Sequence, residues 1–176
     1  MGLLRNRGGD EAEAGTRYQM REKLLSIGDD YWIEDDEGNR AFRVNGKALR
    51  VRQTFVIEDA DGNEVAKIQE RKLSVRDKMA IERGGDSVAT VRKALVGLRD
   101  RFSIDLEDGG ELKAKGNIVD HEYEVERDGN TVATVSKAWF RVRDTYGVQI
   151  APGEDAGLIL AITVCVDAMS DRGAAD

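Results

Sequence analysis

Residues 157–169 read GLILAITVCVDAM, an apolar run interrupted only by Thr163 and Asp167. The run is shorter than the roughly 20 apolar residues that cross a membrane, and it is apolar on every side, so protein must surround it. The periodicity of this run does not distinguish a buried strand from a buried helix. The β-branched side chains within residues 162–166 favour a strand, whereas the length favours a helix, and Glu154 and Asp155 suit the positive end of a helix dipole. We therefore expect a buried C-terminal helix.

Six turn sequences divide the chain before this run. Each contains glycine beside Asp, Asn or Pro, and they recur at intervals of roughly 20–25 residues, a period typical of a repeated supersecondary unit. Apolar and polar side chains alternate on both sides of most turns, as in residues 53–57 and 64–68, which is the signature of β-hairpins. Positive φ angles are expected at four of the turn glycines, namely Gly38, Gly62, Gly109 and Gly129.

The strands before and after the turns, together with residues 18–25, predict a large antiparallel sheet. About twelve strands close into a barrel wide enough to hold one helix, and closure removes exposed sheet edges. The predicted fold is therefore mainly β, a closed antiparallel barrel of about twelve strands around a central hydrophobic C-terminal helix. We expect residues 17–169 to form this single domain, with flexible tails at residues 1–16 and 170–176, which have few apolar side chains.

Composition narrows the classes of function. The chain has 176 residues, 40% of them apolar, and a net charge of -7 from 27 Lys and Arg against 34 Asp and Glu. This acidic balance argues against a nucleic-acid partner, because such binding relies on Lys and Arg at phosphates. The single cysteine, Cys165, excludes an internal disulfide and is expected to be an inert buried thiol. Together with the lack of a signal sequence, a lipidation motif or a transmembrane segment, it predicts a cytoplasmic protein.

Several segments carry a family resemblance. They are YQMREK at 18–23, FRVNGK at 42–47, VATVSK at 132–137, DTYGV at 144–148 and the apolar run with Asp167. With these segments the chain resembles the LURP-one-related proteins, relatives of the tubby C-terminal domain and of the phospholipid scramblases. The resemblance covers about residues 18–169 and implies a twelve-stranded barrel around a central hydrophobic helix. It further implies membrane-related functions, since tubby-like relatives bind phosphoinositide headgroups through basic residues; no site residue is carried over from them.

No catalytic, cofactor or metal site is predicted. His121 is the only histidine, and on a strand it would face away from Asp120 and Glu122. No second histidine, accessible cysteine or glycine-rich phosphate loop completes a reactive set. Asp167 is expected either to reach the barrel mouth or to be hydrogen-bonded, because an unpaired buried carboxylate is costly. The two tryptophans, Trp32 and Trp139, are expected in the core or against the helix.

Basic residues form the candidate site. Strands one repeat apart are expected to lie close together, which would gather phosphate contacts from Arg71, Lys72, Arg92, Lys93 and Lys137. The leading hypothesis is a non-catalytic binding or scaffolding domain that recognises anionic phospholipid headgroups, peripheral to a membrane. The alternatives are a protein-interaction module without lipid binding and, more remotely, an enzyme that uses surface carboxylates.

Overall fold

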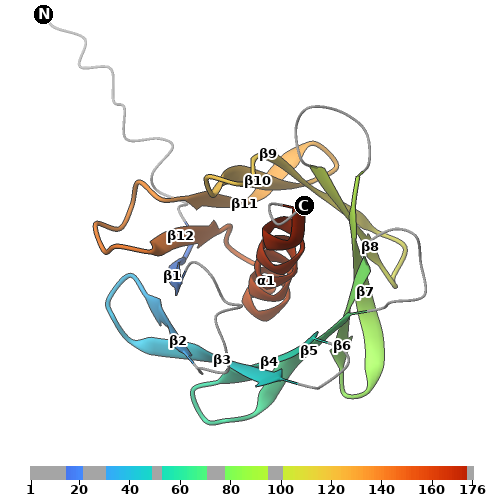
Figure 1. Ribbon diagram of the computed structural model, residues 1–176, viewed down its shortest axis with the longest axis horizontal. Helices are drawn as coiled ribbons and strands as arrows, with labels where there is room; N and C mark the ends of the chain where they lie inside the picture. The colour runs from blue at the N-terminus through green and yellow to red at the C-terminus, as the bar shows by residue number, and fades with distance from the viewer. Residues whose placement is uncertain (1–14, 22–30, 49–52, 71–77, 95–100, 174–176) are drawn as a thin grey trace, which may run out of the picture.

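The computed structural model describes residues 15–21, 31–48, 53–70, 78–94 and 101–173, so residues 1–14 and 174–176 of the expected tails lie outside the described residues. Twelve strands surround one helix (Figure 1). They are β1 (Arg17–Arg21), β2 (Tyr31–Asp35), β3 (Arg40–Ala48), β4 (Gln53–Asp59), β5 (Glu64–Glu70), β6 (Lys78–Arg83), β7 (Asp86–Lys93), β8 (Arg101–Leu106), β9 (Glu111–Asn117), β10 (Glu122–Arg127), β11 (Asn130–Ser136) and β12 (Thr145–Ile150), followed by α1 (Ala156–Gly173).

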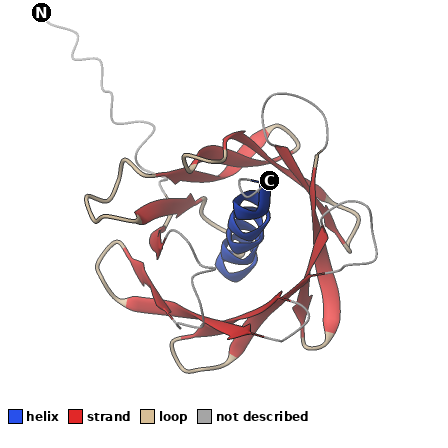
Figure 2. Ribbon diagram, viewed as in Figure 1, coloured by secondary structure: helices blue, strands red, loops and turns tan. Residues whose placement is uncertain are grey.

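The sheet is a closed antiparallel barrel. Every strand pairs with its neighbours in the sequence, and β1 also pairs with β12, with Tyr18 opposite Val148. The helix α1 lies inside the ring of strands (Figure 2). This arrangement confirms the predicted fold, including the choice of a helix over a strand for the apolar run.

Local chemistry explains the hairpin turns. In the β2–β3 turn, Asp35 accepts backbone hydrogen bonds on Oδ1 from the N–H groups of Glu37 and Asn39, at 3.0 and 2.8 Å. Gly38 completes this turn with a φ of 83°, and Gly62 has 86° at the same place in the β4–β5 turn. The predicted positive φ angles are thus confirmed. Residues other than glycine rarely adopt such angles, which explains why glycine occupies these turn positions. A β-bulge directly before four of the turns supplies the extra twist.

Connections between successive strands lie alternately at one end of the barrel and at the other, and the two ends differ. The turn end consists of the hairpin turns and the β12–α1 connection, at residues 35–39, 59–63, 83–86, 106–111, 127–130 and 151–155. The loop end is the opposite one; its described connections are residues 117–122 and 137–144, and strands β6 and β8 begin there while β5 and β7 end there. The helix enters at the turn end, so its C-terminal half lies toward the loop end.

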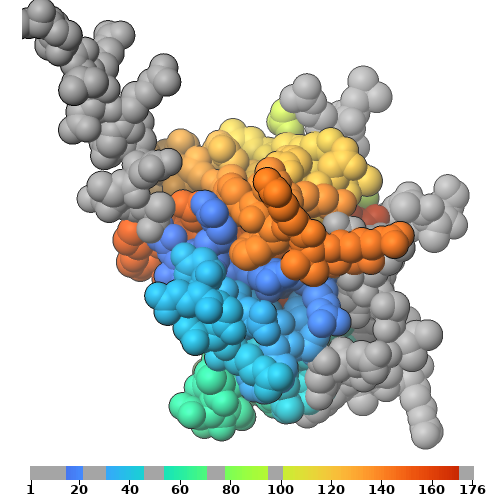
Figure 3. Space-filling model, turned by 90° about the vertical axis from the view of Figure 1, so that its left-hand side faces the viewer, coloured from blue at the N-terminus to red at the C-terminus, as the bar shows by residue number. Residues whose placement is uncertain are grey.

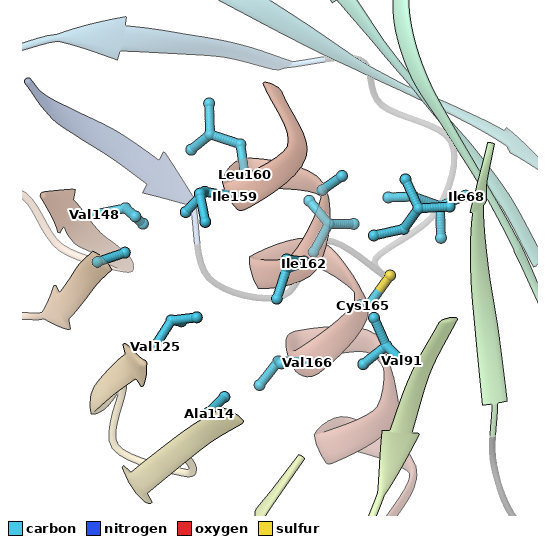
Figure 4. Packing of buried hydrophobic residues seen from close by; sticks show 14 of the residues in the cluster. Ile68, Val91, Ala114, Val125, Val148, Ile159, Leu160, Ile162, Cys165 and Val166 are labelled. Atoms are coloured by element: carbon cyan, nitrogen blue, oxygen red, sulfur yellow. The ribbon is translucent and has the colours of Figure 1, made fainter. Parts of the chain in front are cut away.

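The helix fills the barrel. Asp155 caps its N-terminus, because its Oδ1 accepts a hydrogen bond from the Leu158 N–H at 3.1 Å. Buried side chains of α1 face buried side chains of strands on either side of it (Figure 4). Examples are Ile162, Cys165 and Val166 on the helix with Ile68, Val91, Ala114, Val125 and Val148 on the wall. Cys165 is fully buried in the core, which confirms its expected place as a packing group, and burial raises the pKa of its thiol.

Candidate functional site

The turn end of the barrel is acidic. Each of the segments 34–40, 58–64, 82–86, 105–111, 126–130 and 152–155 contains Asp or Glu, and their basic residues are Arg40, Arg83 and Arg127. Two of these three arginines are bound to local carboxylates. The Arg83 guanidinium binds Asp155 at 2.5 and 2.8 Å, and Arg127 Nη1 binds Glu154 Oε1 at 2.7 Å. The hydrogen bonds from Arg83 hold the pKa of Asp155 below its ordinary value.

The loop end is basic. Its described residues include five carboxylates, Glu70, Asp120, Glu122, Glu124 and Asp144, against a larger set of cations. These cations include Arg21, Lys78, Arg92, Lys93, Arg101, Lys115, Lys137, Arg141 and Arg143. Charge is therefore segregated along the barrel axis, although the chain as a whole carries -7.

Two of the predicted contact residues end strand β7 at this basic end. Lys93 lies opposite Phe102, whose side chain is buried, so Lys93 belongs to the inner face of the sheet at the rim. Arg92 lies on the outer face, opposite Lys78 and Ser103, and its Nη2 is 3.2 Å from Asp105 Oδ2. These two cations thus share a rim but point to opposite faces.

The other predicted residues are placed separately. Lys137 follows β11 directly, and its backbone N–H donates to Glu122 Oε1 at 2.9 Å. Strands β8, β9 and β10 lie between β7 and β11, so Lys137 is on the same end of the barrel as Lys93 but is not its neighbour. Arg71 and Lys72 lie outside the described residues. The described part of the predicted set is therefore distributed around the rim of the loop end.

A buried polar cluster lies near the same end, inside the barrel. Asp167 of α1 is only 5% exposed and accepts a hydrogen bond from the Tyr146 hydroxyl. His121 Nε2 is 3.2 Å from the other carboxylate oxygen of Asp167, and the His121 ring stacks on Tyr146 at 4.3 Å. Of the two alternatives expected for Asp167, the hydrogen-bonded one is confirmed. The cluster ties the helix to β12 and to the β9–β10 turn.

The prediction that His121 lies on a strand is wrong. His121 lies in a turn over residues 118–121, has a φ of 54°, and its N–H donates to the Ile118 carbonyl at 3.1 Å. In this conformation the imidazole turns inward, whereas Asp120 stays on the surface and accepts a hydrogen bond from Asn117 Nδ2 at 2.6 Å. The sequence signal was the Asn117–Asp120 spacing, which is typical of a side-chain-stabilised turn without glycine.

The negative charge of the Asp167 carboxylate affects three buried tyrosines. Burial, followed by the negative charge of Asp167, raises the pKa of Tyr31, Tyr123 and Tyr146 well above the ordinary phenol value. All three phenols therefore remain protonated at neutral pH, and the Tyr146 hydroxyl is the one that donates a described hydrogen bond to Asp167. Because the cluster is enclosed by the barrel wall, we assign it a structural role rather than contact with a substrate.

Outside the barrel, both tryptophans differ from expectation. Trp32 and Trp139 are partly exposed and lie on the outer surface, so the prediction of core positions is wrong. Trp139 packs with Phe140 over Gly147 of β12, where a Cβ atom would come within 2.6 Å of the indole. The Arg17 guanidinium lies 4.4 Å from the centre of the Trp139 ring. Glycine in β12 thus creates the space that holds the β11–β12 loop against the barrel wall.

Two further features of the described residues concern metal binding and membrane insertion. Within the described ranges, no group of three or more His, Cys, Asp or Glu side chains is arranged to hold a metal ion. Nor does that part of the chain contain a helix long and apolar enough to span a bilayer.

Together these features define a class of protein, a closed antiparallel barrel filled by a hydrophobic C-terminal helix and basic at one rim. The chain belongs to the LURP-one-related family, whose sequence profile matches residues 16–167. Among solved structures, it is similar to an Arabidopsis thaliana protein with a TM-score of 0.66 and 19% identity, over 91% of this chain and 95% of that chain. At this identity the similarity concerns the fold. Comparison with curated proteins found no match.

Proposed function

We propose that this protein is a non-catalytic binding domain whose loop end recognises anionic phospholipid headgroups at a membrane surface. The observation that carries the proposal is the segregation of charge along the barrel axis. Lys and Arg side chains attract phosphate groups, and a basic surface gains free energy at an anionic leaflet for each cation brought close.

The net charge of -7 does not oppose this proposal. In an orientation with the loop end toward the bilayer, the acidic turns lie at the far end of the barrel. The helix α1 has 18 residues and is therefore about 27 Å long, so the two ends are farther apart than the Debye length of about 8 Å at physiological salt. The anionic surface then interacts mainly with the basic rim.

Co-sedimentation with vesicles tests the proposal. Phosphatidylcholine vesicles with increasing fractions of phosphatidylserine or phosphoinositide should bind the protein increasingly, and high salt should weaken the binding. The single variants Lys93→Glu and Lys137→Glu should each weaken the binding, and the double variant should lose it. Each single reversal has a matched control in Arg40→Glu, which changes the net charge equally but at the turn end.

The outcomes separate the proposal from its alternatives. Loss of binding in the Lys93 and Lys137 variants, with binding kept in Arg40→Glu, supports docking through the loop end. Equal losses in all variants would mean that only net charge matters. If the wild-type protein binds none of the vesicles, the lipid proposal fails and a protein partner becomes the better hypothesis.

A further inference from the structure

Two large apolar side chains are exposed among the described residues, and both lie at the loop end. Val119 is 68% exposed in the β9–β10 turn, and Val142 is 59% exposed in the loop between β11 and β12. Strands β9 to β12 are consecutive in the barrel, so these two connections are next to each other on the rim, about 10 Å apart at the usual strand spacing. The basic end therefore also carries the exposed apolar residues.

The turn beneath Val119 is fixed on both sides. Ile118 is buried, and His121 reaches inward to within 3.2 Å of Asp167. Asn117 Nδ2 donates to Asp120 Oδ2 at 2.6 Å across the turn. Because its neighbours in the turn are held in place, Val119 projects outward from a rigid support.

The loop that carries Val142 is also anchored. The Thr145 hydroxyl donates to the Val142 carbonyl at 2.7 Å, and the Trp139 ring packs over Gly147. Val142 stands between two arginines, Arg141 and Arg143, both exposed, with the Arg143 side chain 95% exposed. In the space-filling view the orange residues of this loop extend to the right, away from the cyan β2–β3 turn on the left (Figure 3).

We propose that Val119 and Val142 insert into the headgroup–acyl boundary when the loop end docks on an anionic bilayer, while Arg141 and Arg143 contact lipid phosphates. This inference rests on the proposed function and names the residues that make the contact. Apolar side chains beside cations are the combination that binds a membrane interface, because burial of apolar area adds to electrostatic attraction. Insertion of both valines also fixes the orientation of the barrel axis.

Fluorescent labelling at the two positions tests insertion directly. The one native thiol, Cys165, is buried with a raised pKa and does not compete, so Val119→Cys and Val142→Cys can each be labelled with an environment-sensitive dye such as NBD. Anionic vesicles should shift the emission of both labels to the blue. The matched control is Ala60→Cys, an exposed position in the β4–β5 turn, whose label should not respond.

Affinity supplies a second measurement. Val119→Ser and Val142→Ser should each weaken vesicle binding about three- to tenfold, and the double variant more, while the salt dependence stays that of the wild type. Both valines are on the surface, so circular dichroism and thermal melting should be unchanged.

Two results separate the inference from the function on which it rests. If the wild-type protein binds anionic vesicles but neither label shifts and the serine variants bind equally well, insertion is refuted and headgroup recognition stands. If the wild-type protein does not bind, both proposals fail.

Discussion

Replacing Tyr146 with Phe tests the buried cluster that joins α1 to the barrel. The substitution removes one oxygen atom and leaves the ring in place, so it creates almost no cavity. It also removes the hydroxyl that donates to Asp167, a carboxylate that is 5% exposed. Hydrogen bonds to charged groups contribute about 1.5–3 kcal/mol, and we expect Tyr146→Phe to lower the free energy of unfolding by that amount.

Tyr31→Phe is the matched control. Tyr31 is a buried tyrosine in the same electrostatic environment, but its hydroxyl has no hydrogen-bond partner among the described residues. A buried hydroxyl without a partner carries a desolvation cost and gains no hydrogen bond in return. We therefore expect Tyr31→Phe to change stability by less than about 0.5 kcal/mol or to increase it.

Equilibrium unfolding in urea measures both variants. With a slope of about 2 kcal/mol per molar urea, the Tyr146→Phe midpoint should fall by about 1 M, and the Tyr31→Phe midpoint should stay within about 0.3 M of the wild type. The midpoints can be compared if the slope of the unfolding free energy against urea concentration is the same in the wild type and both variants. If both substitutions cost the same, or if Tyr146→Phe costs nothing, the Tyr146–Asp167 hydrogen bond does not stabilise the attachment of the helix to the barrel.

Three further predictions concern other parts of the fold. In the folded protein the pKa of the three buried tyrosines lies above the unfolded value of 10.0. Their contribution to stability is therefore complete below pH 10 and is lost as the pH rises toward the folded value. Absorbance at 295 nm after a pH jump should show that tyrosine ionisation is coupled to unfolding. Gly147→Val should displace the Trp139 ring, cost about 1–3 kcal/mol and shift tryptophan emission to the red. Asp155→Ala should lower the free energy of unfolding by about 1 kcal/mol, because the helix loses its cap. The folded pKa of Asp155 is below its ordinary 3.8, so the contribution of this carboxylate to stability is present above pH 3.8 and is lost as the pH falls through the folded value. The urea unfolding curves of the wild type and the variant should therefore converge in acid.

Much of the fold was predictable because its determinants are local. An Asp that accepts backbone N–H groups and a glycine at positive φ make a hairpin turn from a few adjacent residues, as Asp35 and Gly38 do. The β9–β10 turn lacks this signature. It has no glycine at its tip, and Ile118 continues the apolar pattern of a strand, so the inward position of His121 depends on Asp167, a contact distant in the sequence.

The candidate site was less predictable because it depends on topology. Lys93 and Lys137 share an end of the barrel only because successive connections alternate between the two ends. The strand order also determines that three strands separate them, which a repeat pattern alone does not reveal. The outer position of Trp139 likewise depends on Arg17, which joins it from the first strand of the barrel.

The charge pattern and the helix direction are physically connected. A helix has partial positive charge at its N-terminus and partial negative charge at its C-terminus. The N-terminus of α1 lies among the acidic turns, where Asp155 caps it, and its C-terminal half lies toward the basic loop end. The acidic turns and the basic rim thus both match the helix dipole in this direction of threading. Charge reversals at the rim therefore act on the fold as well as on an anionic ligand, and each binding variant needs its free energy of unfolding measured beside its affinity.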